Sequence, residues 1–286
     1  MVSKNDDKQV SVLVDGLDHP EGLAWGLDGY LYAGGEAGQI YRINIESKDI
    51  DQFACTDGFV LGIALDLSNN IYACDLVNKC VQKITPDGVV SKYSAGALNS
   101  PFITPNYAVF DALGNLYVSD SGDWDLDNGS IYKVNPKGET HIWDTRIKEF
   151  PNGLCLSPDS DYLYLAMSLN VPRISRIKIK DDGSAGDIET LLELPGTVPD
   201  GLAFDIEGNL YIGCYRPDTI YKLDTLGHLD ILAEDYQGTL MASPTNLAFC
   251  GKNLDRMFSA NLGRWHITEY HKGLKGAPLH YPKLNG

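Results

Sequence analysis

One phrase recurs six times along this chain of 286 residues, and its spacing limits the possible folds more than any other feature. In full it reads Pro-x-Gly-Leu-Ala, then an acidic or turn residue, then Gly or Asn, then a hydrophobic residue and Tyr. Successive copies begin 40, 45, 46, 48 and 45 residues apart, at Pro20, Val60, Pro105, Pro151, Pro199 and Pro244. A period of this length along the whole chain is typical of a β-propeller, in which every repeat forms one blade.

Each repeat is expected to form four short strands. In the fifth copy, two apolar runs at 202–204 and 210–212 flank an acidic-Gly turn, which predicts a β-hairpin. A third strand of alternating apolar residues follows, and a Pro-x-Gly turn leads to a fourth. The clearest third strands are 39–43, 130–134 and 219–223.

Six such units predict an all-β, six-bladed β-propeller with four antiparallel strands per blade, occupying residues 1–286 as a single domain. A β-sandwich also contains short strands separated by turns, but the fixed period favours the propeller. The segment from Lys8 to Leu17 precedes the first copy. It is expected to join the last blade and so close the ring.

Composition argues against several classes of partner. The chain has 23 basic and 39 acidic residues and a net charge of −16, which disfavours binding to nucleic acid or to anionic membranes. No apolar stretch approaches the length of a membrane span, and the N-terminus carries charges where a secretory signal is apolar. The six cysteines lack metal-site spacing and are expected to be free thiols. We expect a cytoplasmic protein, monomeric or weakly homo-oligomeric.

The second position of the phrase points to the chemistry, because a ring of blades places equivalent residues around one axis. Four of the six positions carry oxygen donors: Glu21, Asn106, Asn152 and Asp200. Such oxygens suit Ca2+ or another divalent cation such as Mn2+ or Mg2+, with Zn2+ left open. Asp or Asn before Gly is also ordinary turn chemistry. Turn chemistry does not require polar residues to recur at the same position of the phrase, and Glu21 is a poor turn former. Both observations favour the metal site.

The chain resembles the SMP-30/gluconolactonase/LRE-like family over roughly residues 15–280. The segments that carry the resemblance are PEGLAW (20–25), PNYAVFDALGNLYVSDSG (105–122), FPNGLCLSPD (150–159) and PDGLAFDIEGNLYIGCY (199–215). The resemblance implies a catalytic divalent ion on the propeller axis, held by Glu21, Asn152 and Asp200, with Asn106 as a ligand or a substrate contact. Sugar-lactone members often carry Arg just before the third Pro-Asn, where this chain has Ile103-Thr104. A less polar lactone is therefore expected as the substrate.

The reaction implied is hydrolysis of a lactone, with the metal as Lewis acid at the carbonyl and Asp200 as the catalytic residue that takes a proton from water. A metal-bound carboxylate is a weak base, so a metal-bound water or Asp120 remains an alternative. Two other functions stay open. The first is phosphotriester hydrolysis of the diisopropylfluorophosphatase type, and the second is a non-catalytic calcium-binding propeller.

The loops that share a face with the second positions are expected to form the mouth of the site. They supply the candidate substrate contacts Asp120, Trp124, Tyr215, Arg216 and His266, together with Asn106. Residues 123–129 resemble the opening of an EF-hand loop, but the glycine is one place late and Val134 stands where that loop has Glu. An acidic surface loop is the favoured interpretation, with a second calcium site as the alternative.

Overall fold

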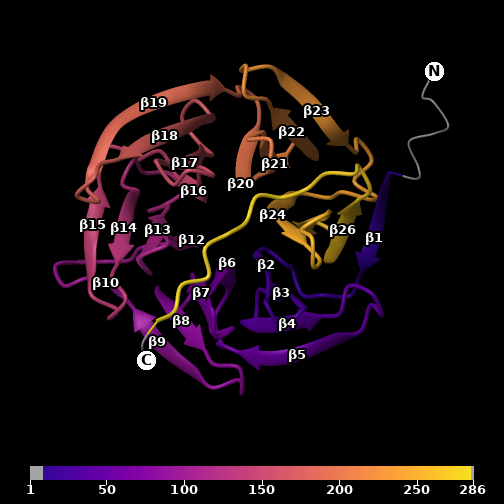
Figure 1. Ribbon diagram of the computed structural model, residues 1–286, viewed down its shortest axis with the longest axis horizontal. Coiled ribbons are helices and arrows are strands. Elements are labelled where there is room, and N and C mark those ends of the chain that lie inside the picture. The colour runs from indigo at the N-terminus through magenta and orange to yellow at the C-terminus, as the bar shows by residue number, and fades with distance from the viewer. Residues whose placement is uncertain (1–8, 285–286) are drawn as a thin grey trace.

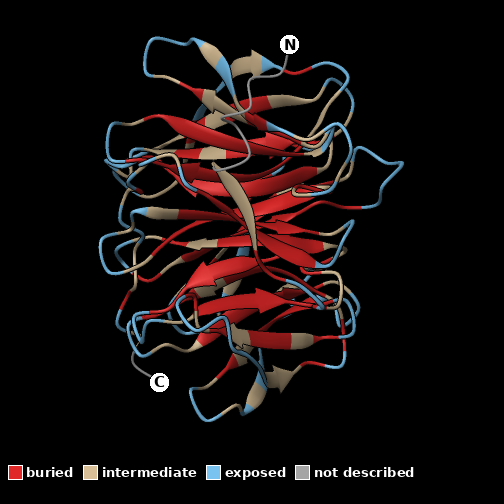
Figure 2. Cartoon of the chain, turned by 90° about the vertical axis from the view of Figure 1, so that its right-hand side faces the viewer, coloured by how far each residue is buried: buried red, intermediate tan, exposed pale blue. Residues whose placement is uncertain are grey.

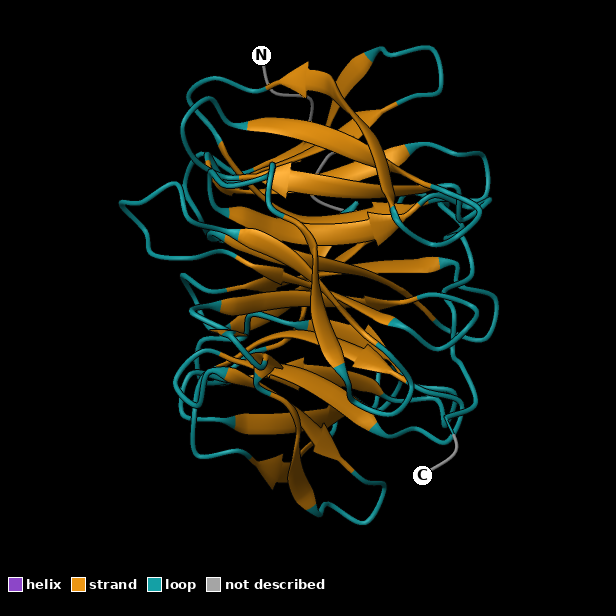
Figure 3. Ribbon diagram, turned by 90° about the vertical axis from the view of Figure 1, so that its left-hand side faces the viewer, coloured by secondary structure: helices purple, strands orange, loops and turns teal. Residues whose placement is uncertain are grey.

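Six four-stranded antiparallel sheets surround a central axis in the computed structural model, which describes residues 9–284 (Figure 1). Strands and loops make up all of this part of the chain, as Figure 3 shows. It contains no helix long and apolar enough to cross a membrane. The predicted six-bladed β-propeller is confirmed.

Within five of the six blades the strands follow one another in the sequence from the axis outwards. The first three blades are β2 (Leu23–Trp25), β3 (Leu31–Gly34), β4 (Gln39–Ile43) and β5 (Ile50–Cys55); β6 (Val60–Leu65), β7 (Ile71–Asp75), β8 (Cys80–Ile84) and β9 (Val90–Ser94); and β12 (Pro105–Phe110), β13 (Leu116–Asp120), β14 (Ser130–Val134) and β15 (Thr140–Asp144). The next two are β16 (Pro151–Leu156), β17 (Tyr162–Met167), β18 (Arg173–Ile179) and β19 (Ala185–Glu193); and β20 (Val198–Phe204), β21 (Leu210–Arg216), β22 (Thr219–Leu223) and β23 (Leu229–Glu234).

The sixth blade joins the two ends of the chain. Its inner strands are β24 (Pro244–Cys250), β25 (Arg256–Asn261) and β26 (His266–Tyr270), and its outer strand is β1 (Val10–Val14). β1 pairs antiparallel with β26, Val10 opposite Tyr270 and Val12 opposite Thr268. The prediction that the segment before the first copy closes the ring is confirmed. A small hairpin, β10 (Gly96–Ala97) and β11 (Ser100–Pro101), lies between the second and third blades.

The acidic residue in the repeated phrase fixes the turn between the first two strands of a blade. In the fifth blade, one oxygen of Asp205 accepts hydrogen bonds from the N–H groups of Glu207 and Asn209. Its other oxygen accepts from the side chains of Asn209 and Tyr211, at 2.7 and 2.9 Å. Asp66 holds Asn70 and Tyr72 in the same way in the second blade. The recurring Asp, Asn and Tyr are therefore a hydrogen-bonded turn unit.

The same tyrosines bind neighbouring blades together. Tyr211 packs edge-on against Phe249, the last aromatic residue of the next inner strand, with ring centroids 5.6 Å apart. Tyr72 meets Phe110 and Tyr164 meets Phe204 in equivalent contacts, each at 4.9 Å. Such edge-to-face pairs add about 1 kcal/mol each to the stabilisation that burial provides. The buried residues consequently run through the whole ring as one band across the strands (Figure 2).

Adjacent inner strands approach each other most closely at the glycine of the phrase. A Cβ atom at Gly153 would lie 2.1 Å from the carbonyl oxygen of Asp200 in the next blade, and one at Gly22 would lie 1.9 Å from that of Leu61. Any side chain here would force two backbones apart. Four of the six copies have glycine at this position, and Tyr107 and Asn246 occupy it in the third and sixth. Where the glycine occurs, it lets neighbouring inner strands approach closely near the axis.

We expect Gly153→Ala to lower the free energy of unfolding by about 3 kcal/mol, because overpacking against rigid backbone cannot be relieved. Gly196→Ala is the control. Gly196 has open space around its Cβ position, but its φ of +82° makes alanine strained, so we expect a loss of about 1 kcal/mol. Thermal or urea denaturation compares the two variants. Equal losses would mean that the close approach at Gly153 does not limit blade packing.

Candidate functional site

The second residues of the phrase lie at one end of the inner strands, buried around the axis. Glu21, Asn106, Asn152 and Asp200 are 8, 4, 5 and 4% exposed. Register shifts interrupt the pairing of the inner strands at this level, for example between Pro151 and Leu154 and between Pro199 and Leu202. A bulge changes which way the following side chains point.

Three of these side chains have buried oxygen atoms without a partner. Among residues 9–284, Glu21 Oε2, Asn152 Oδ1 and Asp200 Oδ1 are sealed from solvent and accept no hydrogen bond. A buried polar atom in this condition costs about 1–3 kcal/mol, and more when it carries charge. Three such oxygens at one repeat phase are the donor set that a hard divalent cation takes. Glu21, Asn152 and Asp200 therefore fit the predicted ion.

The two carboxyl groups influence each other across the channel. Burial, and then the negative charge of Asp200, raise the pKa of Glu21 well above its usual range. Burial raises the pKa of Asp200 to about 7, and the Asn152 side chain opposes that rise. Glu21 belongs to the first blade and Asp200 to the fifth, so only closure of the ring brings them together. A cation between them would remove the repulsion that the metal-free pair experiences.

Two serines orient the asparagine amides. Asn106 donates from Nδ2 to Ser121 Oγ at 2.9 Å, and Ser121 donates to the carbonyl oxygen of Pro151 at 2.7 Å. The next blade repeats the chain of contacts: Asn152 donates to Ser168 Oγ at 3.3 Å, and Ser168 donates to Pro199 at 2.6 Å. Because each amide nitrogen is used as a donor, the carbonyl oxygen of the same amide is left to accept or to ligate.

These serines were not assigned a role from the sequence. Both stand four residues after the tyrosine of the phrase, Tyr117 for Ser121 and Tyr164 for Ser168. Only the two copies with Asn at the second position have a serine at this spacing. The spacing could therefore have identified both serines from the sequence. Thr245 was also missed; it donates to the Glu21 carbonyl at 3.0 Å and fixes the first blade against the sixth.

Asp120 lies beside the ring but is fully engaged with backbone. One of its oxygens accepts from Ile103 N–H, and the other accepts from the N–H groups of Thr104 and Gly122. Burial raises the pKa of Asp120, and these amides oppose the rise. The carboxylate thus holds the loop that leads to Asn106. Its suggested alternative role as a base stays a prediction.

The other proposed substrate contacts are dispersed around the mouth. Trp124 is exposed and meets Phe150 edge-on with ring centroids 4.8 Å apart. Tyr215 is half-buried, and the Arg216 guanidinium lies over its ring at 5.8 Å. His266 is buried, and its Nε2 is bonded to the Leu240 carbonyl at 2.9 Å. Their contacts with a substrate remain predictions, with Trp124 the most open of the three aromatic residues.

The acidic loop suggested as a second calcium site is bonded within itself. Asp123 N–H donates to Asn128 Oδ1, and Asn128 Nδ2 donates back to Asp123 Oδ2, both at 2.9 Å. A separate group lies on the first blade, where His19 Nδ1 contacts Asp18 at 3.0 Å and Glu36 at 2.7 Å. These groups satisfy one another, and the His19 ring also contacts the Trp265 ring in a tilted arrangement, with centroids 4.8 Å apart.

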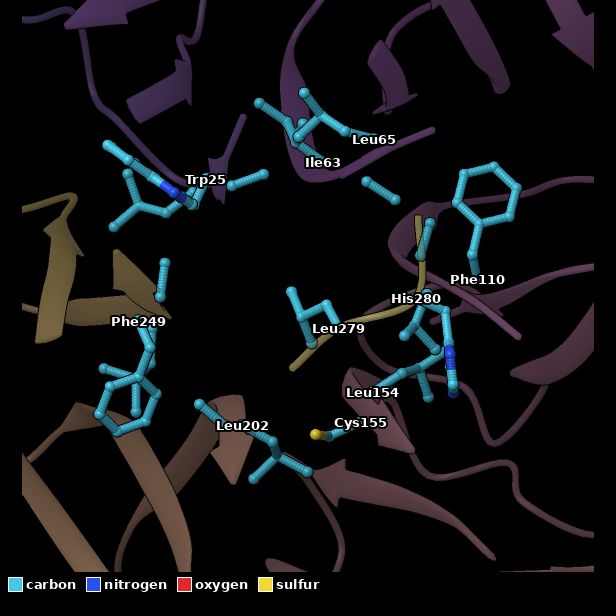
Figure 4. Close-up of a pocket in the computed structure, with 18 of the residues that line it drawn as sticks. Trp25, Ile63, Leu65, Phe110, Leu154, Cys155, Leu202, Phe249, Leu279 and His280 are labelled. Atoms are coloured by element: carbon cyan, nitrogen blue, oxygen red, sulfur yellow. The ribbon is translucent and has the colours of Figure 1, made fainter. Parts of the chain in front are cut away.

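The other end of the channel is apolar and covered by the C-terminal segment, residues 274–284. A cavity of about 80 Å³ lies there, lined by inner-strand residues such as Leu154 and Leu202, with Leu279 reaching over it (Figure 4). The segment crosses the face of the ring (Figure 1) and bonds to several blades: Ala277 N–H to Phe204, Tyr281 Oη to Trp25, and Leu67 N–H to Pro282. A ligand of the oxygen donors would therefore have to enter from the mouth.

Comparison of the sequence with known protein families agrees with this arrangement of oxygen donors in a six-bladed propeller. The pattern of the SMP-30/Gluconolactonase/LRE-like region matches residues 92–261. The chain belongs to this family. A short match to the strictosidine synthase-like N-terminal region covers residues 10–43. Family membership confirms the resemblance found in the sequence.

Curated relatives match only part of the chain. A gluconolactonase of Zymomonas mobilis subsp. mobilis is 25% identical over 181 residues, which cover 56% of this chain and 50% of that protein. An uncharacterized protein of Sulfolobus acidocaldarius is 33% identical over 114 residues, 37% of this chain and 38% of that protein. The matched regions thus span half or less of these relatives.

Solved structures show the same fold over nearly the whole chain. A gluconolactonase of Xanthomonas campestris superposes with a TM-score of 0.79 at 20% identity, covering 93% of this chain and 89% of that one. Regucalcin of Agrobacterium tumefaciens, described as a calcium-binding protein, gives 0.78 at 18% identity, with 96% and 97% covered. At these identities the likeness establishes the propeller fold.

In metal-free protein we expect Asp200→Asn to become more stable than the wild type as pH rises. The folded-state pKa of Asp200, about 7, lies above its unfolded value of about 3.9. The wild type therefore loses stability between these values, while the amide does not titrate. The difference in free energy of unfolding should be small below pH 4 and reach at least about 1.4 kcal/mol above pH 7. Denaturation in chelator measures it, and a pH-independent difference would contradict the raised pKa.

Proposed function

We propose that this protein is a divalent-metal-dependent hydrolase that opens the ring of a lactone. The observation that carries the proposal is the set of three unpartnered buried oxygens, on Glu21, Asn152 and Asp200, at one end of the axial channel. Membership of a family that includes gluconolactonases supports the reaction class. Regucalcin, a calcium-binding structural neighbour, supports a divalent cation, with Ca2+ the ion we expect.

The donor set suits that chemistry. Two carboxylates and one or two amide oxygens would roughly balance the charge of a divalent cation, and their all-oxygen character suits Ca2+ better than Zn2+. A bound cation would supply Lewis acidity toward an ester carbonyl and would stabilise the negative charge that develops there. The remaining steps depend on side chains of the chain itself.

Asp200 is the group we assign to proton transfer from the attacking water. It combines burial with an unpartnered oxygen, and burial without a compensating charge raises its pKa to about 7. Asn106 is held by Ser121 with its amide nitrogen turned away, so its carbonyl oxygen is the group we assign to orienting water or the substrate. Thr245 and Ser168 keep the ring rigid.

The first experiment is hydrolysis of a lactone panel by chelator-treated protein, with and without added Ca2+, Mn2+, Mg2+ or Zn2+. We expect turnover of lactones that depends on the added cation, and no comparable turnover of a paraoxon-type phosphotriester. A preference for the phosphotriester would assign the protein to the second candidate class. Absence of turnover, together with a rise in melting temperature on adding Ca2+, would indicate a calcium-binding propeller without this activity.

Asp200→Asn should abolish turnover, with a fall of at least about 10³-fold in kcat, because the variant loses both a ligand charge and the proton acceptor. Asp205→Asn is the matched control. Asp205 lies in the same blade and is equally buried, but all its bonds belong to the turn at the far end. We expect the control to lose stability while it keeps turnover and the rise in melting temperature with Ca2+. Wild-type activity in Asp200→Asn would remove this residue from the mechanism.

A further inference from the structure

We propose that four apolar side chains above the third and fourth blades, Trp124, Leu126, Phe150 and Val171, form a wall that binds an alkyl side chain of the lactone. This inference rests on the proposed function and names its substrate class, an alkyl-substituted lactone rather than a polyhydroxylated one. We refer to these four residues as the apolar wall.

Topology places the apolar wall at the mouth, beside the two asparagines of the ring. Trp124 and Leu126 lie in the loop after β13, and Val171 lies in the loop after β17. Phe150 immediately precedes β16, two residues before Asn152. All three loops lie at the end where the inner strands begin, because second strands run back to that end.

The apolar wall is exposed in spite of its hydrophobic character. Trp124, Leu126 and Val171 are 57, 56 and 50% exposed, and they lie on neighbouring loops rather than singly. Grouped exposed apolar side chains beside a polar site are typical of a ligand-binding surface. The Trp124 ring meets that of Phe150 at an interplanar angle of 72°, and more than half of Trp124 stays exposed.

Two residues of the apolar wall are held in backbone conformations that their side chains disfavour. Phe150 has φ of 57° and Val171 has φ of 71°, in the left-handed region that bulky and β-branched residues rarely adopt. Such strain persists where the surrounding structure imposes it, and it is concentrated at functional sites. Here hydrogen bonds impose it at Phe150, which donates from its N–H to Lys148 and accepts at its carbonyl from Ser168 N–H.

Polar contacts behind the apolar wall fix its three loops to one another. Asn170 donates to Asp127 at 2.5 Å and so joins the loop of Val171 to the loop of Trp124. Arg173 donates to Glu149 at 2.8 Å and joins the fourth blade to the segment of Phe150. Gly129 N–H donates to the Lys148 carbonyl at 3.1 Å and completes the connection. The surface is therefore preorganised for its ligand.

The rest of the mouth gives the ligand one orientation. The first blade presents Asp18, His19 and Glu36, and the fifth presents Arg216. An alkyl group is stabilised over the third and fourth blades and disfavoured over these charged groups. The segment that leads to Asn106 agrees with this division, because Ile103 and Thr104, which precede Pro105, carry no charge. The lactone ring would then lie over Glu21 and Asp200 with its chain toward Trp124.

The apolar cavity at the far end of the channel does not serve the same purpose. A chain could reach it from the mouth only by passing through the ring of Glu21, Asn106, Asn152 and Asp200, and the C-terminal segment covers its other side. Val77 and Trp265 are also exposed on mouth loops, in the second and sixth blades, but each lies singly there. The apolar wall is the grouped apolar surface that a ligand at the mouth can contact while its ester lies at the oxygen donors.

The test uses a series of γ-lactones with unbranched side chains of increasing length, from none to about eight carbons, and the cation-loaded full-length protein. Binding is followed by calorimetry and turnover by release of acid. We expect affinity, and kcat/KM where turnover occurs, to rise about fourfold per methylene until the apolar wall is covered. A glucono-type lactone should bind no better than the unsubstituted ring.

Trp124→Ala should flatten the dependence on chain length, while Trp124→Phe should retain most of it. Leu226→Ala is the control, because Leu226 is 80% exposed in the turn between β22 and β23 on the opposite face. It should keep the full dependence on chain length.

The outcomes separate this inference from the proposed function. If turnover does not depend on the length of the lactone side chain, or if that dependence remains in Trp124→Ala, the apolar wall does not bind the side chain. Either result would leave the proposed lactonase activity in place. Binding that depends on chain length and on Trp124, without hydrolysis of any lactone, would support the apolar wall and overturn the lactonase.

Discussion

The structure depends on the contact between neighbouring inner strands at the axis. At Gly22, Gly153 and Gly201 the backbone of the next blade lies where a Cβ would be. This approach, which the glycine allows in four of the six copies, holds neighbouring inner strands close together around the axis. The aromatic contacts between blades and the closure by β1 maintain the ring, but the glycines determine how narrow it is.

A narrow ring has an electrostatic consequence. Glu21 and Asp200 are buried without compensating donors, so burial and mutual repulsion raise the pKa of Glu21 and burial raises that of Asp200. Evolution would be expected to remove such a pair if it served only stability, since neutral residues cost less here. Leu61, at the same repeat phase, shows that the fold accepts an apolar side chain. The divalent cation that we propose for this site would offset the cost of burying the two carboxylates.

The two ends of the channel have opposite character, and each depends on a different part of the chain. Oxygen donors and the apolar wall lie at the mouth, on loops that the fold allows to vary. The far end is apolar and is covered by the C-terminal segment, which bonds to the first, second and fifth blades. Such a cover both fastens the blades together and directs a ligand to the mouth.

The sequence by itself determined the fold, the closing strand and the ring of oxygen donors, because these follow from a repeat: a fixed period sets equivalent residues around an axis. Third strands such as 39–43 and 219–223 were predicted to the residue, since alternation and turn residues are local signals. Only the tertiary structure showed that Asp120 and His266 are already bonded, that Ser121 orients Asn106, and that Phe150 and Trp124 meet. These contacts join different strands or loops, and a one-dimensional pattern does not contain the distances between them.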